Sequence, residues 1–142
     1  MNYVYDDGGR AQAGYKGQAG DCTVRAIAIA TELPYQEVYD ELSHRVKNGP
    51  QRKGRLPKAS ARNGVPMSVT RKYMESLRWE WTPTMQIGSG CQVHLRADEL
   101  PAGRLVVRVT KHLAAVVDGV IHDTHDPSRD GTRCVYGYFR RS

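Results

Sequence analysis

Two apolar runs joined by Asp118-Gly119 constrain the fold of this chain more than any other feature of its sequence. Residues 112–117 read HLAAVV and residues 120–123 read VIHD. An Asp-Gly pair between such runs predicts a β-hairpin with a two-residue turn, because that turn needs positive φ at both central positions. The turn also sets the register: Val117 lies opposite Val120, and Ala114 lies opposite Asp123.

This register brings an imidazole and a carboxylate together. Side chains alternate between the two faces of a strand, so His112, Ala114, Asp123 and His125 share one face. His112 and Asp123 become diagonal neighbours, about 7–8 Å apart at Cα and closer at their side chains. A base and the acid that orients it are thus expected on adjacent strands, and the small Ala114 leaves room for another element to approach.

A cysteine stands at the start of the most apolar segment of the chain. The segment CTVRAIAIAT, residues 22–31, follows Asp21, a residue type favoured as an N-cap. It predicts a buried helix, since it is apolar on nearly every side. Cys22 then lies in the first turn, where the helix dipole and the free backbone N–H groups stabilise a thiolate. The alternative is an inert buried cysteine, and the helix alone does not distinguish a reactive Cys22 from an inert one.

The remaining pattern places helices before strands. The chain has 142 residues and is 39% hydrophobic, which suits a single domain over residues 1–142. Residues 1–20 predict an irregular arm, and residues 48–66 predict a basic loop. We expect further helices at 35 to about 46, at 68–77 and, as one short turn, at 97–100, and strands at 79–85 (with Pro83 marking an edge), 104–110, 112–117, 120–124 and 134–140. This order predicts an α+β fold in which N-terminal helices, with the Cys22 helix buried at the centre, pack on a C-terminal antiparallel sheet.

The order of cysteine, histidine and aspartate along the chain resembles that of the papain-like cysteine peptidases. The segment Gly20-Asp21-Cys22 and the segment from His112 to Asp123 are similar to those of the smaller bacterial members, including the bacteriocin-processing peptidases. The strings GDCTVRAIAIAT and HLAAVVDGVIHDTHDPSRDGTRCVYGY also resemble short papain-like proteins of phages and bacteria. The resemblance extends over about residues 15–140, and its specific motifs are these two segments.

The resemblance implies a papain-like fold and a thiol-dependent hydrolase, a peptidase or an isopeptidase or amidase, which acts on a peptide or protein through an acyl-enzyme. By this resemblance Cys22 is the nucleophile, His112 the general base and acid, and Asp123 the group that orients His112. Papain-like enzymes carry a glutamine shortly before the cysteine, which implies Gln18 as an oxyanion donor beside the Cys22 backbone N–H. Transfer of the acyl group to an amine would use the same residues.

The positive charge of the chain is concentrated in one segment. The net charge is +6, and residues 45–72 contain no Asp or Glu but nine cationic residues: Arg45, Lys47, Arg52, Lys53, Arg55, Lys58, Arg62, Arg71 and Lys72. Such a block can bind phosphates or an acidic protein. The alternative, which is the commoner case, is a solvated loop whose charge keeps the protein soluble. No aromatic residue interleaves with it before Tyr73, which makes nucleic acid the less favoured partner. The alternative to an enzyme is a non-catalytic protein of papain-like fold, such as a phage or plasmid accessory protein, that binds an acidic partner or nucleic acid through residues 45–72.

Cysteine content and hydropathy bear on the compartment. The N-terminus shows no secretory signal, and the longest apolar runs are far shorter than the roughly 20 residues that cross a bilayer. We therefore expect a cytoplasmic protein without membrane contact. Its three cysteines, Cys22, Cys91 and Cys134, are expected to be free thiols in a reducing compartment, with the latter two as bystanders.

The cluster HDTHD at residues 122–126 invites a metal-site interpretation. Strand alternation sends His122 and His125 to opposite faces, which argues against a shared ion. We therefore expect neither a metal nor a cofactor.

Overall fold

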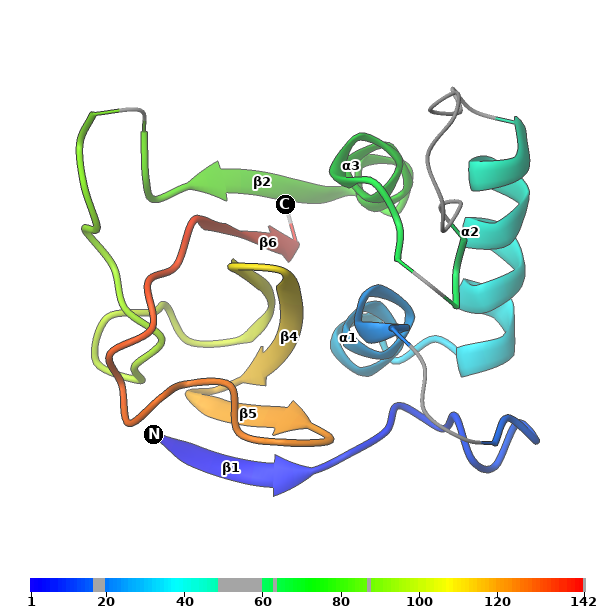
Figure 1. The fold of residues 1–142 in the computed structure, drawn as a ribbon, viewed down its shortest axis with the longest axis horizontal. Helices are drawn as coiled ribbons and strands as arrows, with labels where there is room; N and C mark the ends of the chain where they lie inside the picture. The colour runs from blue at the N-terminus through cyan, green and yellow to red at the C-terminus, as the bar shows by residue number, and fades with distance from the viewer. Residues whose placement is uncertain (17–19, 49–59, 63, 87, 142) are drawn as a thin grey trace.

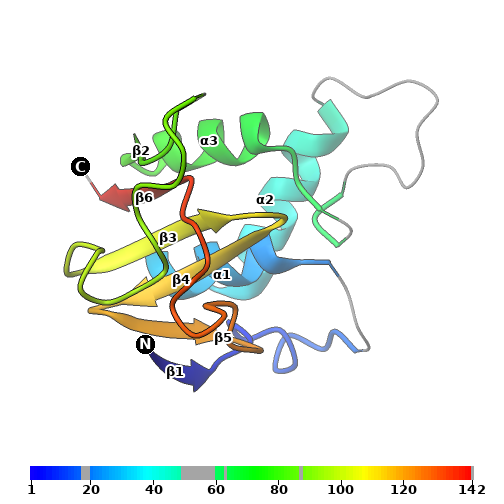
Figure 2. The ribbon, with the colours of Figure 1, turned by 60° about the vertical axis from the view of Figure 1, so that its left-hand side comes forward.

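Three helices lie beside a six-stranded sheet in the computed structural model, which describes residues 1–16, 20–48, 60–62, 64–86 and 88–141 (Figure 1). The elements in chain order are β1 (Asn2–Tyr5), α1 (Cys22–Thr31), α2 (Tyr35–Asn48), α3 (Met67–Ser76), β2 (Trp79–Pro83), β3 (Arg104–Val109), β4 (His112–Val117), β5 (Val120–Asp123) and β6 (Gly137–Arg141). The strands lie in the order β1-β5-β4-β3-β6-β2, as Figure 2 shows from the side. The prediction of an α+β fold is confirmed.

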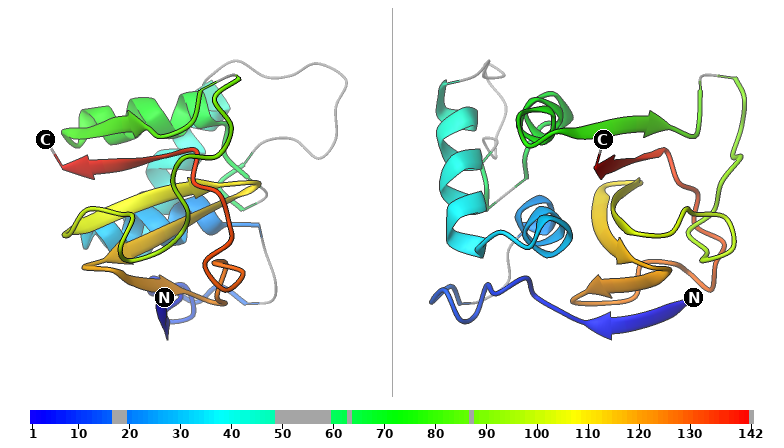
Figure 3. Two further views of the ribbon diagram at one scale, coloured as in Figure 1. Left: turned by 90° about the vertical axis from the view of Figure 1, so that its left-hand side faces the viewer. Right: turned by 180° about the vertical axis from the view of Figure 1, so that it is seen from behind.

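Helix α1 lies at the centre of the helical layer, between the sheet and α2 (Figures 1 and 3). Its apolar residues are buried nearly all round, as the sequence predicts for a central helix. Val24 and Ile27 are fully buried and join Val106 and Phe139 of the sheet in one core cluster. Helix α2 packs outside α1 and α3 through a single apolar stripe that includes Leu42. The sequence therefore places the Cys22 helix correctly.

The predicted hairpin is present with the predicted register. Val117 pairs with Val120 and Ala115 with His122 in an antiparallel ladder. Asp118 and Gly119 both have positive φ, 48° and 79°, as a type I′ turn requires. A second tight hairpin joins β3 to β4, because Val109 pairs with His112 across the turn at Thr110 and Lys111. The strand that carries His112 is thus held by hydrogen bonds on both sides.

The N-terminal segment is not the irregular arm that its composition predicts. Residues Asn2–Tyr5 form β1, which adds to the sheet parallel to β5, with Tyr5 beside Asp123. The sheet is therefore mixed and not antiparallel. Val4 and Tyr5 remain 47% and 68% exposed, and only Tyr3 of β1 packs against a core cluster, so β1 is held largely by backbone pairing and lacks the apolar alternation that would mark it as a strand. Its end fixes the end of β5, where the backbone N–H of Asp6 donates to the Asp123 carbonyl at 2.9 Å.

Other element boundaries differ in detail from the prediction. Helix α2 continues to Asn48, and α3 begins at Met67 after Pro66 without a capping Ser68. Residues 97–100 form a turn and not a helix, and β6 starts at Gly137, three residues later than expected. Strand β2 ends at Pro83 and lies at the sheet edge, as Pro83 predicts. Of the predicted basic loop, residues 49–59 and 63 lie outside the described residues, while Ser60 and Gly64 form an isolated antiparallel bridge.

The prediction that all three cysteines are free thiols is wrong. Cys91 and Cys134 form a disulfide across a sequence separation of 43 residues, with their Cα atoms 5.8 Å apart, and Cys22 is the free cysteine. The bridge ties together the two long connections on the sheet face opposite α1, where the second core cluster, including Leu95 and Val135, is buried. The spacing of the cysteines gives no sign of this pairing, because it is created by the fold.

Within the described ranges, no helix combines the length and the apolar character needed to cross a bilayer.

Candidate active site

Cys22 is the first residue of α1 and lies half-buried at the start of the helix. It opens onto a cavity of about 450 Å³, which is also lined by His112 and His125. The His112 side chain and the backbone N–H of Leu113 lie beside its sulfur, and both act to lower the pKa of the thiol. The structure therefore brings the predicted cysteine and histidine together, at the point where α1 meets β4.

His112 is held from its other side by Asp123. Its Nε2 lies 2.6 Å from Oδ2 of Asp123, and the two side chains are only 11% and 3% exposed. The backbone N–H of Thr124 donates to the second carboxylate oxygen, Oδ1, at 2.7 Å. Asp123 is thus fixed by the strand end and by this bond, and it fixes the orientation of the imidazole ring.

These contacts change the ionisation of both members of the pair. Burial alone would raise the pKa of the Cys22 thiol, but the hydrogen bond and charge of His112, the Leu113 N–H and the charge of Arg25 outweigh it and lower the pKa. Burial lowers the pKa of His112, but the hydrogen bonds to Asp123 and Cys22 reverse that effect and raise the pKa to about 9. A lowered thiol pKa beside a raised imidazole pKa favours a thiolate–imidazolium pair over the neutral pair.

Asp21 does not cap α1 as the sequence predicts. Its side chain makes no capping hydrogen bond, and it is 1% exposed within a cluster of polar partners. Arg25 and the hydroxyl of Tyr35 donate to its two oxygens, and Arg10 Nε lies 3.0 Å from Oδ2. Because Arg25 lies one helical turn after Asp21 on the same face, the pair forms within the helix and leaves the first backbone N–H groups of α1 uncapped by Asp21.

Arg25 links this cluster to the candidate site. Its second terminal nitrogen lies 3.8 Å from Oδ1 of Asp123, so one guanidinium contacts both buried carboxylates. Sequence analysis missed this role of Arg25. The i,i+4 spacing from Asp21 is the sequence signal for this ion pair, and it competes with the prediction that Asp21 caps the helix.

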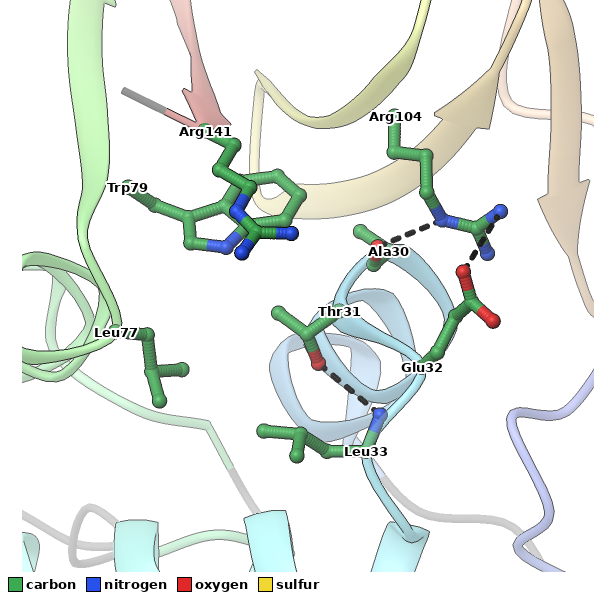
Figure 4. A pocket seen from close by; sticks show the side chains of 8 residues that line it. All are labelled: Ala30, Thr31, Glu32, Leu33, Leu77, Trp79, Arg104 and Arg141. Atoms are coloured by element: carbon green, nitrogen blue, oxygen red, sulfur yellow. Dashed lines mark hydrogen bonds and ion pairs between the residues drawn. The ribbon is translucent and has the colours of Figure 1, made fainter.

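The other end of α1 is anchored by Arg104 of β3 (Figure 4). Its guanidinium donates to the carbonyl oxygens of Ala30 and Ile29, both at 2.8 Å, and its Nη1 lies 3.4 Å from a carboxylate oxygen of Glu32. These bonds satisfy carbonyl groups that the end of the helix leaves without partners. A hollow of about 390 Å³ lies here, but the described residues of its lining include neither cysteine nor histidine. Helix α1 is thus held at both ends, which fixes Cys22 relative to β4.

The oxyanion donors are the least complete part of the candidate site. The backbone N–H of Cys22 lies in the first turn of α1, where it has no partner one turn back within the helix. Gln18, the other predicted donor, lies outside the described residues. The Cys22 N–H is therefore the donor that the described part of the chain offers.

His125 joins the site from the segment after β5. Its ring lies 5.0 Å from that of His112, and ligand atoms of His112, Asp123 and His125 all lie within 4.8 Å of one another. His122 is directed elsewhere and contacts Asp6, as the alternation of strand faces predicts. The hairpin register predicts that His112, Asp123 and His125 share one face, and together they have the donor types of a metal site. Nε2 of His112 and Oδ2 of Asp123 are occupied by their mutual hydrogen bond, however, and Arg25 supplies a positive charge beside Asp123.

The described part of the basic segment 45–72 is partly neutralised within the helices. Arg45 Nε lies 2.7 Å from Glu41, and Arg71 Nε lies 3.8 Å from Glu75. The Arg45 guanidinium also covers the Tyr73 ring at 5.3 Å. Arg52, Lys53, Arg55 and Lys58 lie outside the described residues. Neither predicted partner of this segment gains support from these contacts.

Comparison of the chain with family models, with curated proteins and with solved structures finds no match.

Proposed function

We propose that this chain is a thiol-dependent hydrolase of papain-like fold that cleaves an amide bond in a peptide or protein through an acyl-enzyme. One observation carries the proposal: His112 shares a cavity with Cys22, whose thiol pKa it lowers, and is hydrogen-bonded through Nε2 to the buried Asp123. A nucleophile, a base and a group that orients the base are the arrangement that covalent acyl transfer requires.

In the first half of the proposed reaction, the Cys22 thiolate attacks the carbonyl carbon of the scissile amide. A carbon–sulfur bond forms, and the carbonyl electrons move to oxygen, where the Cys22 N–H and, in our proposal, Gln18 stabilise the negative charge. The carbon–nitrogen bond then breaks while His112 gives its proton to the leaving nitrogen. The products of this half are a free amine and a thioester on Cys22.

In the second half, neutral His112 takes a proton from water, and the resulting hydroxide attacks the thioester carbon. The carbon–sulfur bond breaks, a carboxylic acid leaves, and the thiolate–imidazolium pair is restored. An amine in place of water gives acyl transfer with the same residues. Asp123 keeps Nε2 of His112 protonated throughout, so that the other ring nitrogen stays directed at sulfur.

The fold supports the papain-like part of the proposal. The cysteine opens a buried helix, and the histidine and aspartate follow on adjacent antiparallel strands packed near that helix's first turn. The non-catalytic alternative, binding through residues 45–72, gives no reason for a buried carboxylate that fixes an imidazole against a cysteine.

A peptide-library digest tests the proposal. Wild-type protein and the near-isosteric Cys22→Ser variant are incubated with a broad peptide library, and new termini are quantified by mass spectrometry. We expect new termini with the wild type only. After acid quenching, the wild-type peptide that contains Cys22 should also be heavier by the mass of the acyl group, as a thioester on Cys22. Equal products from both proteins, or no products and no adduct from a folded wild type, would contradict the proposal.

A further inference from the structure

The cavity beside Cys22 carries an excess of positive charge. Among the described residues, its lining includes Arg25, Arg108 and Lys111 together with His112 and His125, and it contains no Asp or Glu. The rest of this lining is small or apolar and includes Gly64, Val65 and Leu113. An unbalanced cluster of one sign in a cleft attracts ligands of the opposite sign.

The charge of Arg25 is already used, but the charges of Arg108 and Lys111 are not. Arg25 pairs with Asp21 and lies near Asp123. No carboxylate of the described residues lies within ion-pair distance of Arg108 or Lys111, and residues 17–19, 49–59 and 63 contain no Asp or Glu in the sequence. Two cations therefore remain available to a ligand in the cavity.

Their positions are fixed by the hairpin that carries His112. Arg108 is the residue of β3 paired with Leu113, the neighbour of His112 on β4. Lys111 directly precedes His112, in the turn, with φ at 56°. Both cations thus stand beside the strand end at which His112 contacts Cys22, within the same cavity.

We propose that Arg108 and Lys111 select acyl groups with a carboxylate close to the scissile bond, such as peptides with Asp or Glu beside the cleaved residue. This inference rests on the proposed hydrolase function. A partly exposed ion pair changes a rate by only a few-fold, so the two cations together are expected to contribute about three- to tenfold.

Two alkylating reagents of nearly the same shape test this inference. Iodoacetate carries a carboxylate where iodoacetamide carries a neutral amide, and each transfers its carbon to the Cys22 sulfur while iodide leaves. The ratio of their second-order rate constants at Cys22 cancels differences in thiolate content. It is measured at neutral pH for wild type, Arg108→Gln, Lys111→Gln and the double variant. Arg140→Gln is the matched control, since Arg140 is exposed and pairs with Leu105 at the other end of β3.

We expect the iodoacetate-to-iodoacetamide ratio to fall about three- to tenfold from wild type to the double variant. The ratio of Arg140→Gln should match the wild type, and added salt at about 0.5 M should remove most of the difference by screening. A double variant with the wild-type ratio, while Cys22 still reacts, would overturn the inference and leave the hydrolase proposal intact. A wild type in which Cys22 reacts with neither reagent would instead overturn the hydrolase proposal itself.

Discussion

His112 and Asp123 meet across a single hairpin, with Nε2 of the imidazole 2.6 Å from Oδ2 of the carboxylate. Their strands are joined by a two-residue turn, so the pair depends on one local register and on few distant contacts. The half-buried Cys22 completes the arrangement from a different element, the start of α1. Rigid strands therefore fix the base, and the anchoring of one helix fixes the nucleophile.

The coupled ionisation of His112 and Cys22 predicts that their effects on stability oppose each other as the pH changes. A raised imidazole pKa favours the folded state below about pH 6.5, and that contribution is lost as pH rises toward about 9. The lowered thiol pKa acts in the opposite direction, because its contribution appears as pH rises toward the ordinary thiol value of 9.0. The two slopes cancel in the wild type, since folded and unfolded pairs both hold one proton.

In the Cys22→Ala variant the opposing slope of the thiol is gone, and only Asp123 still raises the pKa of His112, because the contribution of Cys22 to that rise is lost. The variant's free energy of unfolding should fall with pH above 6.5 relative to the wild type, by up to about 1.4 kcal/mol per pH unit while the folded imidazole keeps its proton. Urea unfolding at several pH values from 6 to 9 measures both proteins. Parallel curves for the two proteins would show that the ionisation states are uncoupled.

Replacement of Arg25 tests its role between the two buried carboxylates. Arg25→Met removes a cation that contacts Asp21 and lies 3.8 Å from Asp123, both nearly fully buried. We expect a loss of about 3 kcal/mol in the free energy of unfolding and a higher Cys22 pKa. Arg25→Lys keeps the charge and is the matched control for the thiol pKa, measured from the pH dependence of alkylation. An unchanged thiol pKa in Arg25→Met would contradict this role.

Loss of the Cys91–Cys134 disulfide should lower the stability of the protein without changing the reactivity of the Cys22 thiol. Without reductant, a thiol reagent should label Cys22 alone, and after reduction of the unfolded chain it should label all three cysteines. The Cys91→Ala/Cys134→Ala variant should lose about 2–4 kcal/mol of stability, because the bridge closes a long loop in the unfolded state. Its Cys22 labelling rate should match the wild type. Labelling of three cysteines in the native, unreduced protein would show that the bridge is absent.

The close packing of Gly137 in β6 against Trp81 in β2 can be tested by adding a methyl group at position 137. A Cβ at this position would lie 2.8 Å from the Thr82 carbonyl oxygen and closer still to the six-membered ring of Trp81. Gly137→Ala should therefore cost about 1–3 kcal/mol through overpacking. The cost should be smaller in a Trp81→Phe background, which removes the ring atoms in closest approach. Equal costs in both backgrounds, measured as a double-mutant cycle, would contradict the contact.

The part of the site that lies on the hairpin could be predicted from the sequence because its determinants are local. Asp118-Gly119 fixes the turn, the turn fixes the register, and alternation then places His112 and Asp123 on one face. The burial of α1 could also be predicted from the sequence, since CTVRAIAIAT has no polar face apart from Arg25.

The remaining features depend on contacts between distant segments, which no local pattern encodes. Strand β1 is held by backbone hydrogen bonds to β5, so its exposed side chains show no alternation. The Cys91–Cys134 bridge joins two loops that the fold alone brings together. Asp21 does not cap α1, because its carboxylate instead contacts Arg10 and Tyr35, which come from segments before and after the helix.

The most direct test of the central claim is the alkylation rate of Cys22 at pH 6, compared between wild type and His112→Ala by mass spectrometry of the labelled peptide. An ordinary thiol is roughly one part in several hundred to a thousand ionised at this pH, whereas a thiolate paired with imidazolium is largely ionised. We predict fast labelling of the wild type and a fall of about a hundredfold in His112→Ala, with Lys72→Gln as an unaffected control. Slow and equal labelling of the wild type and His112→Ala would contradict the account.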